Sequence, residues 1–556
     1  MEFIKFILIY FFLTLSIIGY GLIFSLKLTK YNNFYKSNIS IGYVGIFGIF
    51  FLILISYLTN LFFPHDNLHN LLVLIIGISF FLFFFFLNKI KFELRYFFLA
   101  YLLSFFAIFY FKSHDDFSYY HLSFINNLIL NKTEFGVGQF DPAFNHVSSL
   151  FYFHSLFKTV ITKDFFYQIG QLGIIIFVNT ILFENIFNSA KSKKLDLIFF
   201  LSIFCVIFAN IFFYRLAEHG TDRSAQILFF LSFILIIKLI DSKQVLKQNF
   251  EILLIIFTLI ISIKSFYILY SVLFLYIYFK YFKVSQFLEF CKNFKILYLC
   301  FSVFLLTLFY NISHSGCFLY PVKFTCPDIF FWGLGKEKVL HYMTWYELWS
   351  KAGATPTYRV ENVTEYLSGL NWLPIWMENY FFNKMSDYLL GILLAIIIVL
   401  LFFKPINFKF KNFKNYFSVY FLIFLLFLEW FLRHPSLRYG GYVIIFLLLT
   451  FPISLLLTSQ NFSFKKKKNS IITIFLICLV IFAGRNVNRL FKENHVYKYN
   501  LLKNPYYRMD DNFFYMQKSK IKLFKDKDKC YEDNSLSYIK CRKIGNYRFY
   551  YSSKKN

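Results

Sequence analysis

Long apolar runs divide this chain, and no other feature constrains its fold as strongly. A transmembrane helix needs about 20 predominantly apolar residues, with a range of about 17 to 25. We predict an all-α polytopic membrane protein with about 14 transmembrane helices. The apolar runs lie near residues 4–26, 40–63, 70–88, 96–112, 165–188, 197–213, 225–240, 251–262, 266–281, 296–312, 386–403, 416–432, 442–458 and 470–484.

The distribution of charge sets the expected orientation of these helices. The chain carries 58 Lys and Arg against 30 Asp and Glu, a net charge of +28, which in a soluble protein would suggest a nucleic-acid partner. Only 16% of its residues are charged, however, against roughly 25% in a soluble domain. Lysines gather in alternate short loops, which the positive-inside rule places in the cytoplasm. We therefore predict a multi-pass protein of the bacterial inner membrane that contacts lipids and no nucleic acid.

The remaining segments are expected on the periplasmic side. They include two long loops, at 113–164 and 313–385, and a tail at 485–556 that is expected to form a small outward domain. This topology requires residues 251–281 to form two short helices that meet at Lys264. One long tilted helix is the alternative, but it would break the alternation of basic loops.

Four of the eight cysteines form two close pairs in outward segments. Cys317 lies near Cys326, and Cys530 lies near Cys541. Such pairs favour disulfides formed in an oxidising periplasm. A zinc site is the alternative, although neither pair has the short C-x-x-C spacing of zinc knuckles.

The first of three polar clusters follows the fourth apolar run and contains Asp115, Asp116 and His121. In one interpretation the two carboxylates only complement the N-terminus of a short helix. In the other, their mutual repulsion raises the pKa of one carboxyl group, which then acts as a base or a metal ligand. Residues 143–159 carry apolar side chains at helical spacing and are predicted to form an amphipathic helix at the membrane interface.

The second cluster contains Glu218, Asp222 and Arg223 between two apolar runs. These residues either cap the following helix or belong to a site in the same compartment as Asp115. Lys264 lies within a largely apolar stretch, where an ammonium group is costly unless it is paired or faces water.

The third cluster contains Arg433, His434, Arg438 and Tyr439, directly before the pair Gly440-Gly441. Two arginines in an outward turn oppose the positive-inside trend. Guanidinium groups bind phosphate or carboxylate through two parallel hydrogen bonds, and glycines allow close backbone approach. We predict an anion site here; an anchor to lipid headgroups is the alternative.

These features resemble the GT-C superfamily of polytopic glycosyltransferases, which use polyprenyl-phosphate sugars. Asp115 and Asp116 stand in the position of the acidic motif of that family, and residues 143–159 correspond to its juxtamembrane helix. The motif of the family usually follows the first transmembrane helix, whereas here it follows the fourth. The three clusters also look like those of a set of uncharacterised bacterial multi-pass membrane proteins.

The resemblance implies a GT-C-like fold in four parts. These are a three-helix extension at 1–95, a catalytic module at 96–385, further transmembrane helices at 386–484 and the outward tail at 485–556. It implies a glycosyltransferase that moves a sugar from a polyprenyl-phosphate donor to a glycan or lipid acceptor of the cell envelope.

The same resemblance implies roles for the polar residues. Asp115 and Asp116 are the expected catalytic residues, as base or as ligands of a divalent cation such as Mg²⁺ or Mn²⁺. The expected substrate-binding residues are His121, Glu218, Asp222, Arg223, Lys264, Arg433, His434, Arg438 and Tyr439.

Two alternatives have different consequences. An O-antigen polymerase or ligase also combines many helices with outward arginines, and it would make the arginines primary. A transporter or flippase of lipid-linked glycans would place ionisable groups near the middle of the bilayer. The clusters here are expected at one face, which favours surface chemistry over transport.

Overall fold

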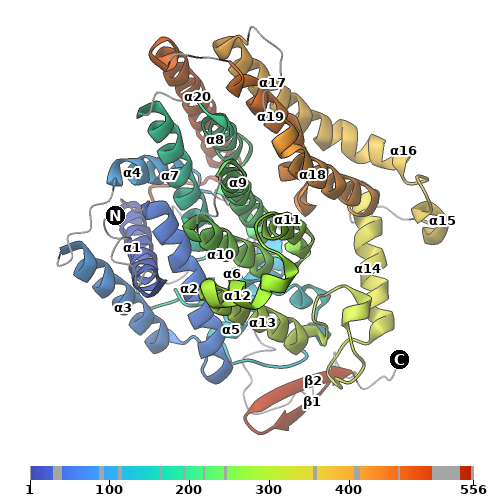
Figure 1. Ribbon diagram of the computed structural model, residues 1–556. Helices are drawn as coiled ribbons and strands as arrows, with labels where there is room; N and C mark the ends of the chain where they lie inside the picture. Colours follow the sequence, from blue (N-terminus) through green and yellow to red (C-terminus); the bar gives the residue numbers. More distant parts are fainter. Residues whose placement is uncertain are drawn as a thin grey trace.

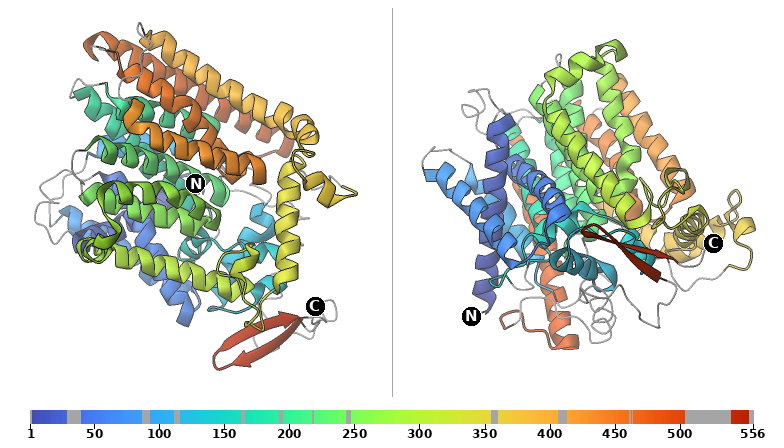
Figure 2. Two further views of the ribbon diagram at one scale, coloured as in Figure 1. Left: turned by 45° about the vertical axis from the view of Figure 1, so that its right-hand side comes forward. Right: turned by 90° about the horizontal axis from the view of Figure 1, so that it is seen from below.

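The computed structural model describes residues 2–28, 40–86, 93–110, 116–162, 166–191, 195–216, 219–242, 247–354, 360–405, 413–460, 462, 464–503 and 539–552. These residues form a bundle of helices with a small β-hairpin at its periphery (Figures 1 and 2). The α-helices are α1 (Glu2–Leu28), α2 (Ile41–Phe62), α3 (Asn67–Phe86), α4 (Leu94–Phe106), α5 (Leu122–Leu130), α6 (Ser149–Ser155), α7 (Ile169–Lys191), α8 (Leu197–Ile207), α9 (Gly220–Asp241), α10 (Lys247–Ile263), α11 (Ser271–Tyr281), α12 (Phe287–Asn293), α13 (Ile296–Ser315), α14 (Lys336–Lys351), α15 (Val363–Leu367), α16 (Leu373–Trp376), α17 (Ser386–Phe403), α18 (Phe413–Arg433), α19 (Gly441–Thr458) and α20 (Phe464–Tyr497).

The chain is a multi-pass membrane protein by the length and hydropathy of its helices. Ten helices of the described residues are long and apolar enough to span a membrane, or up to 11 if the bent pair at 265–281 and 284–293 is one span. The prediction of about 14 spans is therefore too high, although each predicted run does contain a helix. Helix α4, with 13 residues, is about 20 Å long, and α8 together with the π-helix η4 (Phe208–Phe212) that continues it is about 24 Å long. Neither crosses the roughly 30 Å of hydrocarbon alone.

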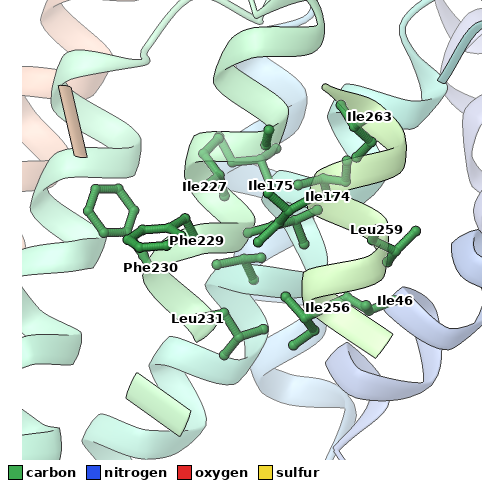
Figure 3. Packing of buried hydrophobic residues seen from close by; sticks show 14 of the residues in the cluster. Ile46, Ile174, Ile175, Ile227, Phe229, Phe230, Leu231, Ile256, Leu259 and Ile263 are labelled. Atoms are coloured by element: carbon green, nitrogen blue, oxygen red, sulfur yellow. The ribbon is translucent and has the colours of Figure 1, made fainter. Parts of the chain in front are cut away.

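Helices α7 and α9 form the centre of the bundle. In each, 89% of the most apolar window is buried, against 28% in α3, α17 and α18 and 22% in α20. A helix that is apolar on all sides is stable when other helices surround it. Figure 3 shows this packing, in which Ile174 and Ile175 of α7 lie near Phe229 and Leu231 of α9. The poorly buried helices then present their apolar side chains to lipid.

The predicted division at Lys264 is confirmed. Helix α10 ends at Ile263, Lys264 is extended, and a 3₁₀ helix, η6 (Ser265–Tyr270), leads into α11. The break brings the Lys264 side chain to the N-terminal end of α9, where its ammonium group lies 2.9 Å from Asp222.

The prediction of an interfacial helix over residues 143–159 is wrong. The structure has a 3₁₀ helix, η3 (Pro142–Asn145), followed by the two-turn helix α6, which starts after the N-cap Ser148. All seven residues of α6 are buried, so the segment packs inside the protein and not along the bilayer. The apolar side chains do lie at helical spacing, but the polar side chains between them form hydrogen bonds inside the protein. The hydroxyls of Ser149 and Ser262, for example, lie 2.9 Å apart.

The end of the last predicted span and the all-α prediction also require correction. Helix α20 continues to Tyr497, beyond the expected end of the last span at 484. The all-α prediction missed the antiparallel hairpin of β1 (Ile539–Ile544) and β2 (Tyr547–Ser552). Most of the segment between α20 and β1 lies outside the described residues.

The hairpin is attached to the segment between α5 and the 3₁₀ helix η2 (Val137–Gln139). Phe135 forms a bridge with Phe549, and their rings stack with centroids 4.4 Å apart. The buried Glu134 carboxylate accepts a 2.9 Å contact from Arg548 and a hydrogen bond from Tyr550. Burial of the Glu134 carboxylate makes this attachment specific, because a misplaced hairpin would leave Glu134 unpaired.

Of the predicted disulfides, Cys317–Cys326 is present. Cys541 is also disulfide-bonded, and Cys530 lies outside the described residues.

Candidate functional site

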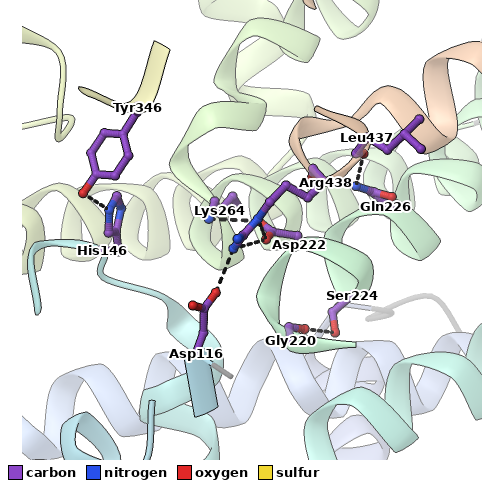
Figure 4. Close-up of polar contacts among 10 residues, drawn as sticks. All are labelled: Asp116, His146, Gly220, Asp222, Ser224, Gln226, Lys264, Tyr346, Leu437 and Arg438. Carbon is purple, nitrogen blue, oxygen red and sulfur yellow. Dashed lines mark hydrogen bonds and ion pairs between the residues drawn. The ribbon is translucent and has the colours of Figure 1, made fainter. Parts of the chain in front are cut away.

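Four charged side chains from four separate segments meet at one end of the bundle, and we call them the Arg438 cluster (Figure 4). Asp116 directly precedes a π-helix, η1 (Phe117–His121), and Asp222 lies in the first turn of α9. Lys264 follows α10, and Arg438 lies in a 3₁₀ turn, η10 (Leu437–Tyr439), between α18 and α19. The cluster thus joins segments more than 300 positions apart in the sequence, since Asp116 and Arg438 are separated by 322.

Arg438 is the centre of the cluster. Its Nη2 lies 2.9 Å from Oδ2 of Asp116 and 3.0 Å from Oδ2 of Asp222, and its Nε donates to the same Asp222 oxygen at 3.1 Å. Lys264 Nζ lies 2.9 Å from Oδ1 of Asp222. Two cations and two carboxylates balance, which reduces the cost of placing four charges at the ends of apolar helices.

The cluster is partly open to solvent. The Arg438 and Asp116 side chains are 30% and 26% exposed, whereas those of Lys264 and Asp222 are 18% and 13% exposed. Burial lowers the pKa of Arg438, but Asp222 and Asp116 more than reverse this and raise it well above its ordinary value. Arg438 is therefore a permanent cation with an accessible edge.

Other helices hold the turn that carries Arg438 in place. Its backbone at 435–438 accepts hydrogen bonds from the side chains of Gln226, Trp376 and Trp430, at 2.8 to 2.9 Å for the shortest from each. The hydroxyl of Tyr380 accepts one from the Leu437 amide at 2.7 Å. Buried donors of this kind fix a backbone strongly, since leaving any of them unpaired costs about 1–3 kcal/mol.

Gly440 ends this turn in the left-handed region, with φ of 94°. A Cβ at this position would lie 2.1 Å from the Tyr270 hydroxyl. The sequence predicted that the two glycines allow close approach of the backbone to an anion. In the structure the groups that approach are the aromatic side chains of Tyr270 and, at Gly441, Trp430.

Aromatic and histidine side chains surround the cluster. The Arg438 guanidinium lies 5.6 Å from the Trp349 ring and 5.7 Å from the Tyr439 ring, as in cation–π contacts. His146 pairs through Nε2 with the Tyr346 hydroxyl at 2.7 Å. Burial, together with Lys264 and Arg438, lowers the pKa of His146 to about 3, so the ring is neutral at pH 7. A neutral histidine beside two cations is a suitable hydrogen-bond partner for a bound hydroxyl or phosphate.

The remaining predicted residues lie around the cluster and not in it. The Arg433 side chain is 67% exposed and reaches Glu347 only at 3.9 Å. Arg223 lies over the Phe213 ring, and His121 packs against Phe151. The His434 ring lies 5.6 Å from that of Tyr439.

Asp115 and Glu218 lie outside the described residues, so their predicted roles stay predictions. Within the described part of the chain, no group of three or more His, Cys, Asp or Glu is arranged to hold a metal ion. The described residues therefore offer no third ligand for the metal site that was predicted at Asp115 and Asp116. The Asp116 carboxylate is instead paired with Arg438.

Sequence reasoning missed three residues that build the site. Gln226 lies about one helical turn after Asp222 on α9, within an apolar run, and no local pattern marks it. His146 was assigned to an amphipathic helix, and Tyr346 belongs to α14, which carries two of the tryptophans of the long loop. That aromatic concentration at 345–349 was the available signal, because cation–π contacts favour aromatic rings near an arginine.

Comparison with curated proteins and with solved structures gives no match. One family model matches, described as a domain of unknown function, DUF8201, and it covers residues 1–445. The matched region contains all four residues of the Arg438 cluster and ends before α20 and the hairpin. The chain belongs to the DUF8201 family of multi-helix proteins.

Proposed function

We propose that this protein transfers a sugar from a polyprenyl-phosphate donor to a glycan or lipid acceptor of the cell envelope, at the periplasmic face. The Arg438 cluster carries the proposal. It combines carboxylates, a fixed guanidinium and an ammonium group at one end of the bundle, where a lipid phosphate in the outer leaflet is within reach. Charge stabilisation of this kind is usually the largest contribution to catalysis.

The proposed step breaks the bond between the anomeric carbon and the phosphate oxygen and forms a bond to an acceptor oxygen. Asp116 takes the proton of the acceptor hydroxyl. The polyprenyl phosphate leaves with the bonding electrons, and Arg438 and Lys264 stabilise its growing negative charge. Asp222 holds both cations in position throughout, since it contacts each of them.

The experiment measures lipid-linked sugars by mass spectrometry in a strain that lacks the protein. We expect a lipid-linked sugar to accumulate and to disappear on complementation with the wild type. The double variant Asp115→Asn, Asp116→Asn should fail to complement while it still inserts into the membrane. Asp328→Asn, which changes an exposed outward carboxylate paired with Lys336, is the control and should complement fully. Complementation by the double variant would refute the assignment of Asp115 and Asp116.

A second candidate is an O-antigen polymerase or ligase. It is favoured by the central place of Arg438, which contacts both aspartates of the cluster. In that case Asp116 only orients the guanidinium. Activity that survives loss of Asp115 and Asp116 but not loss of Arg433 and Arg438 would select this candidate.

A further inference from the structure

A cavity of about 450 Å³ lies at the opposite end of the bundle from the Arg438 cluster. It is lined by the N-terminal parts of α2 and α10, the C-terminal parts of α7 and α9, and Glu93. Lys238, in the last turn of α9, is 16 residues from Asp222, or about 24 Å along the helix. The size lies in the range of about 300 to 1,000 Å³ that small-molecule sites occupy.

Two charged side chains that face this cavity have no oppositely charged group in contact with them among the described residues. Lys238 Nζ donates to Asn185 Oδ1 at 2.9 Å, which is a neutral acceptor, and it interacts with the carboxylates of Asp196 and Glu184 only at a distance. Glu184 interacts with the Ser40 side chain and, at a distance, with Lys238. No carboxylate within 4.0 Å of Lys238 and no cation within 4.0 Å of Glu184 belongs to the described part of the chain. Unpaired charges at the end of an apolar helix are costly and usually functional.

The rim of the same cavity shows what a paired arrangement looks like. Glu93 contacts Arg95 at 3.2 Å and Lys191 at 3.3 Å, and these side chains are well exposed. The charged side chains at the rim therefore form ion pairs with one another, whereas, among the described residues, Glu184 and Lys238 do not. The difference indicates that Glu184 and Lys238 are kept for a ligand.

Two uncharged polar atoms support this conclusion. The Tyr43 hydroxyl and the Asn185 Nδ2 are buried and have no hydrogen-bond partner in the described structure. Both residues line the cavity. A buried polar group without a partner costs about 1–3 kcal/mol, which a ligand that bonds to it recovers.

We propose that this cavity binds a zwitterion that carries a phosphate or carboxylate a few atoms from an ammonium group. The anionic group lies against Lys238 and Asn185 Nδ2, and the ammonium group lies against Glu184. A ligand with only a negative charge would meet Glu184, and one with only a positive charge would meet Lys238. The proposal is independent of glycosyl transfer at the other end of α9.

Two sources supply this chemistry: the headgroup of a lipid such as phosphatidylethanolamine, and a free soluble zwitterion. The test uses the purified full-length protein and native mass spectrometry with phosphatidylethanolamine and phosphatidylglycerol as probes. We expect the wild type to retain the zwitterionic lipid at least about tenfold better than the anionic one. Soluble glycerophosphoethanolamine that displaces the lipid identifies a free zwitterion as the ligand, and failure to displace it identifies the lipid headgroup.

The variants Lys238→Gln and Glu184→Gln should reduce this preference to within about twofold. Lys238→Arg keeps the charge and should restore most of it. Lys283→Gln is the control, because Lys283 follows α11 at the same end of the bundle, is exposed and does not line the cavity. Equal retention of the two lipids and no binding of the soluble headgroup by the wild type would overturn the proposal without reference to any variant. So would a preference that persists in both Gln variants.

Discussion

The charged side chains at the two ends of α9 differ in whether they contact an opposite charge. At the N-terminal end, Asp222 contacts Lys264 and Arg438 directly, and Arg438 also reaches Asp116. At the C-terminal end, Lys238 donates to the neutral Asn185 and lies beside a cavity. The first arrangement is complete without a ligand, whereas the second is not.

This difference separates two kinds of site. In the proposed reaction a substrate phosphate exchanges places with a carboxylate of the Arg438 cluster, so that its binding is coupled to the release of Asp116 as a base. In the cavity a ligand adds contacts that nothing else makes. We therefore expect substitutions in the cluster to affect chemistry and folding together, and substitutions in the cavity to affect binding.

The largest expected effect follows replacement of Arg438. Arg438→Gln should lower transfer activity by about 10²- to 10³-fold, the usual loss when one group that stabilises developing charge is removed. Arg438→Lys should not restore it, since an ammonium group lacks the fork that reaches two carboxylates. Arg433→Gln is the matched control, because Arg433 is largely exposed. The measurement is transfer of labelled sugar in membrane vesicles; equal losses in the Arg438 and Arg433 variants would contradict the assignment.

The next largest effect is the coupling free energy between charged residues, which double-mutant cycles measure at each end of α9. We expect Asp222→Asn and Lys264→Gln to show a coupling free energy of about 1–3 kcal/mol, because their charged atoms are in contact. Glu184→Gln and Lys238→Gln, which share no such contact, should add to within about 0.5 kcal/mol. Thermal unfolding of the purified protein measures both cycles. Strong coupling between Glu184 and Lys238 would mean that the cavity charges pair with each other.

The smallest expected effect is on the pH dependence of stability. The pKa of His146 is lowered to about 3, below the ordinary value of about 6.5 for an unfolded chain. Its contribution to stability is complete above about pH 6.5 and is lost as the pH falls toward 3. Between pH 7 and pH 5 we expect a loss of about 2 kcal/mol that His146→Gln reduces. His341→Gln, at an exposed position on α14, should leave the profile unchanged.

The sequence allowed the helices and part of the cluster to be predicted, for identifiable reasons. Apolar runs located the helices, and the break at Lys264 followed from charge alone. Asp116, Asp222, Lys264 and Arg438 were each marked because a charge next to an apolar run is costly. Their contacts with one another are long-range, and no local pattern specifies which carboxylate an arginine reaches.

The errors also have physical causes. Hydropathy does not measure helix length, so α4 and α8 were counted as spans. Periodicity over 143–159 cannot distinguish a helix at the membrane surface from one that the fold buries completely. The cavity beside Lys238 was missed because Glu184, Asn185 and Lys238 stand singly at the ends of two apolar helices. Only the packing of α7 against α9 brings them together.

Photocrosslinking tests the central claim, that Arg438 holds the phosphate of a polyprenyl carrier, most directly. A polyprenyl phosphate with a diazirine beside its headgroup is irradiated with the purified protein, and labelled peptides are identified by mass spectrometry. We predict labelling at residues 437–442 and at the N-terminal end of α9 in the wild type and in Arg433→Gln, and its loss in Arg438→Gln. Labelling that is unchanged in Arg438→Gln, or that falls at the Lys238 end of α9, would contradict the claim.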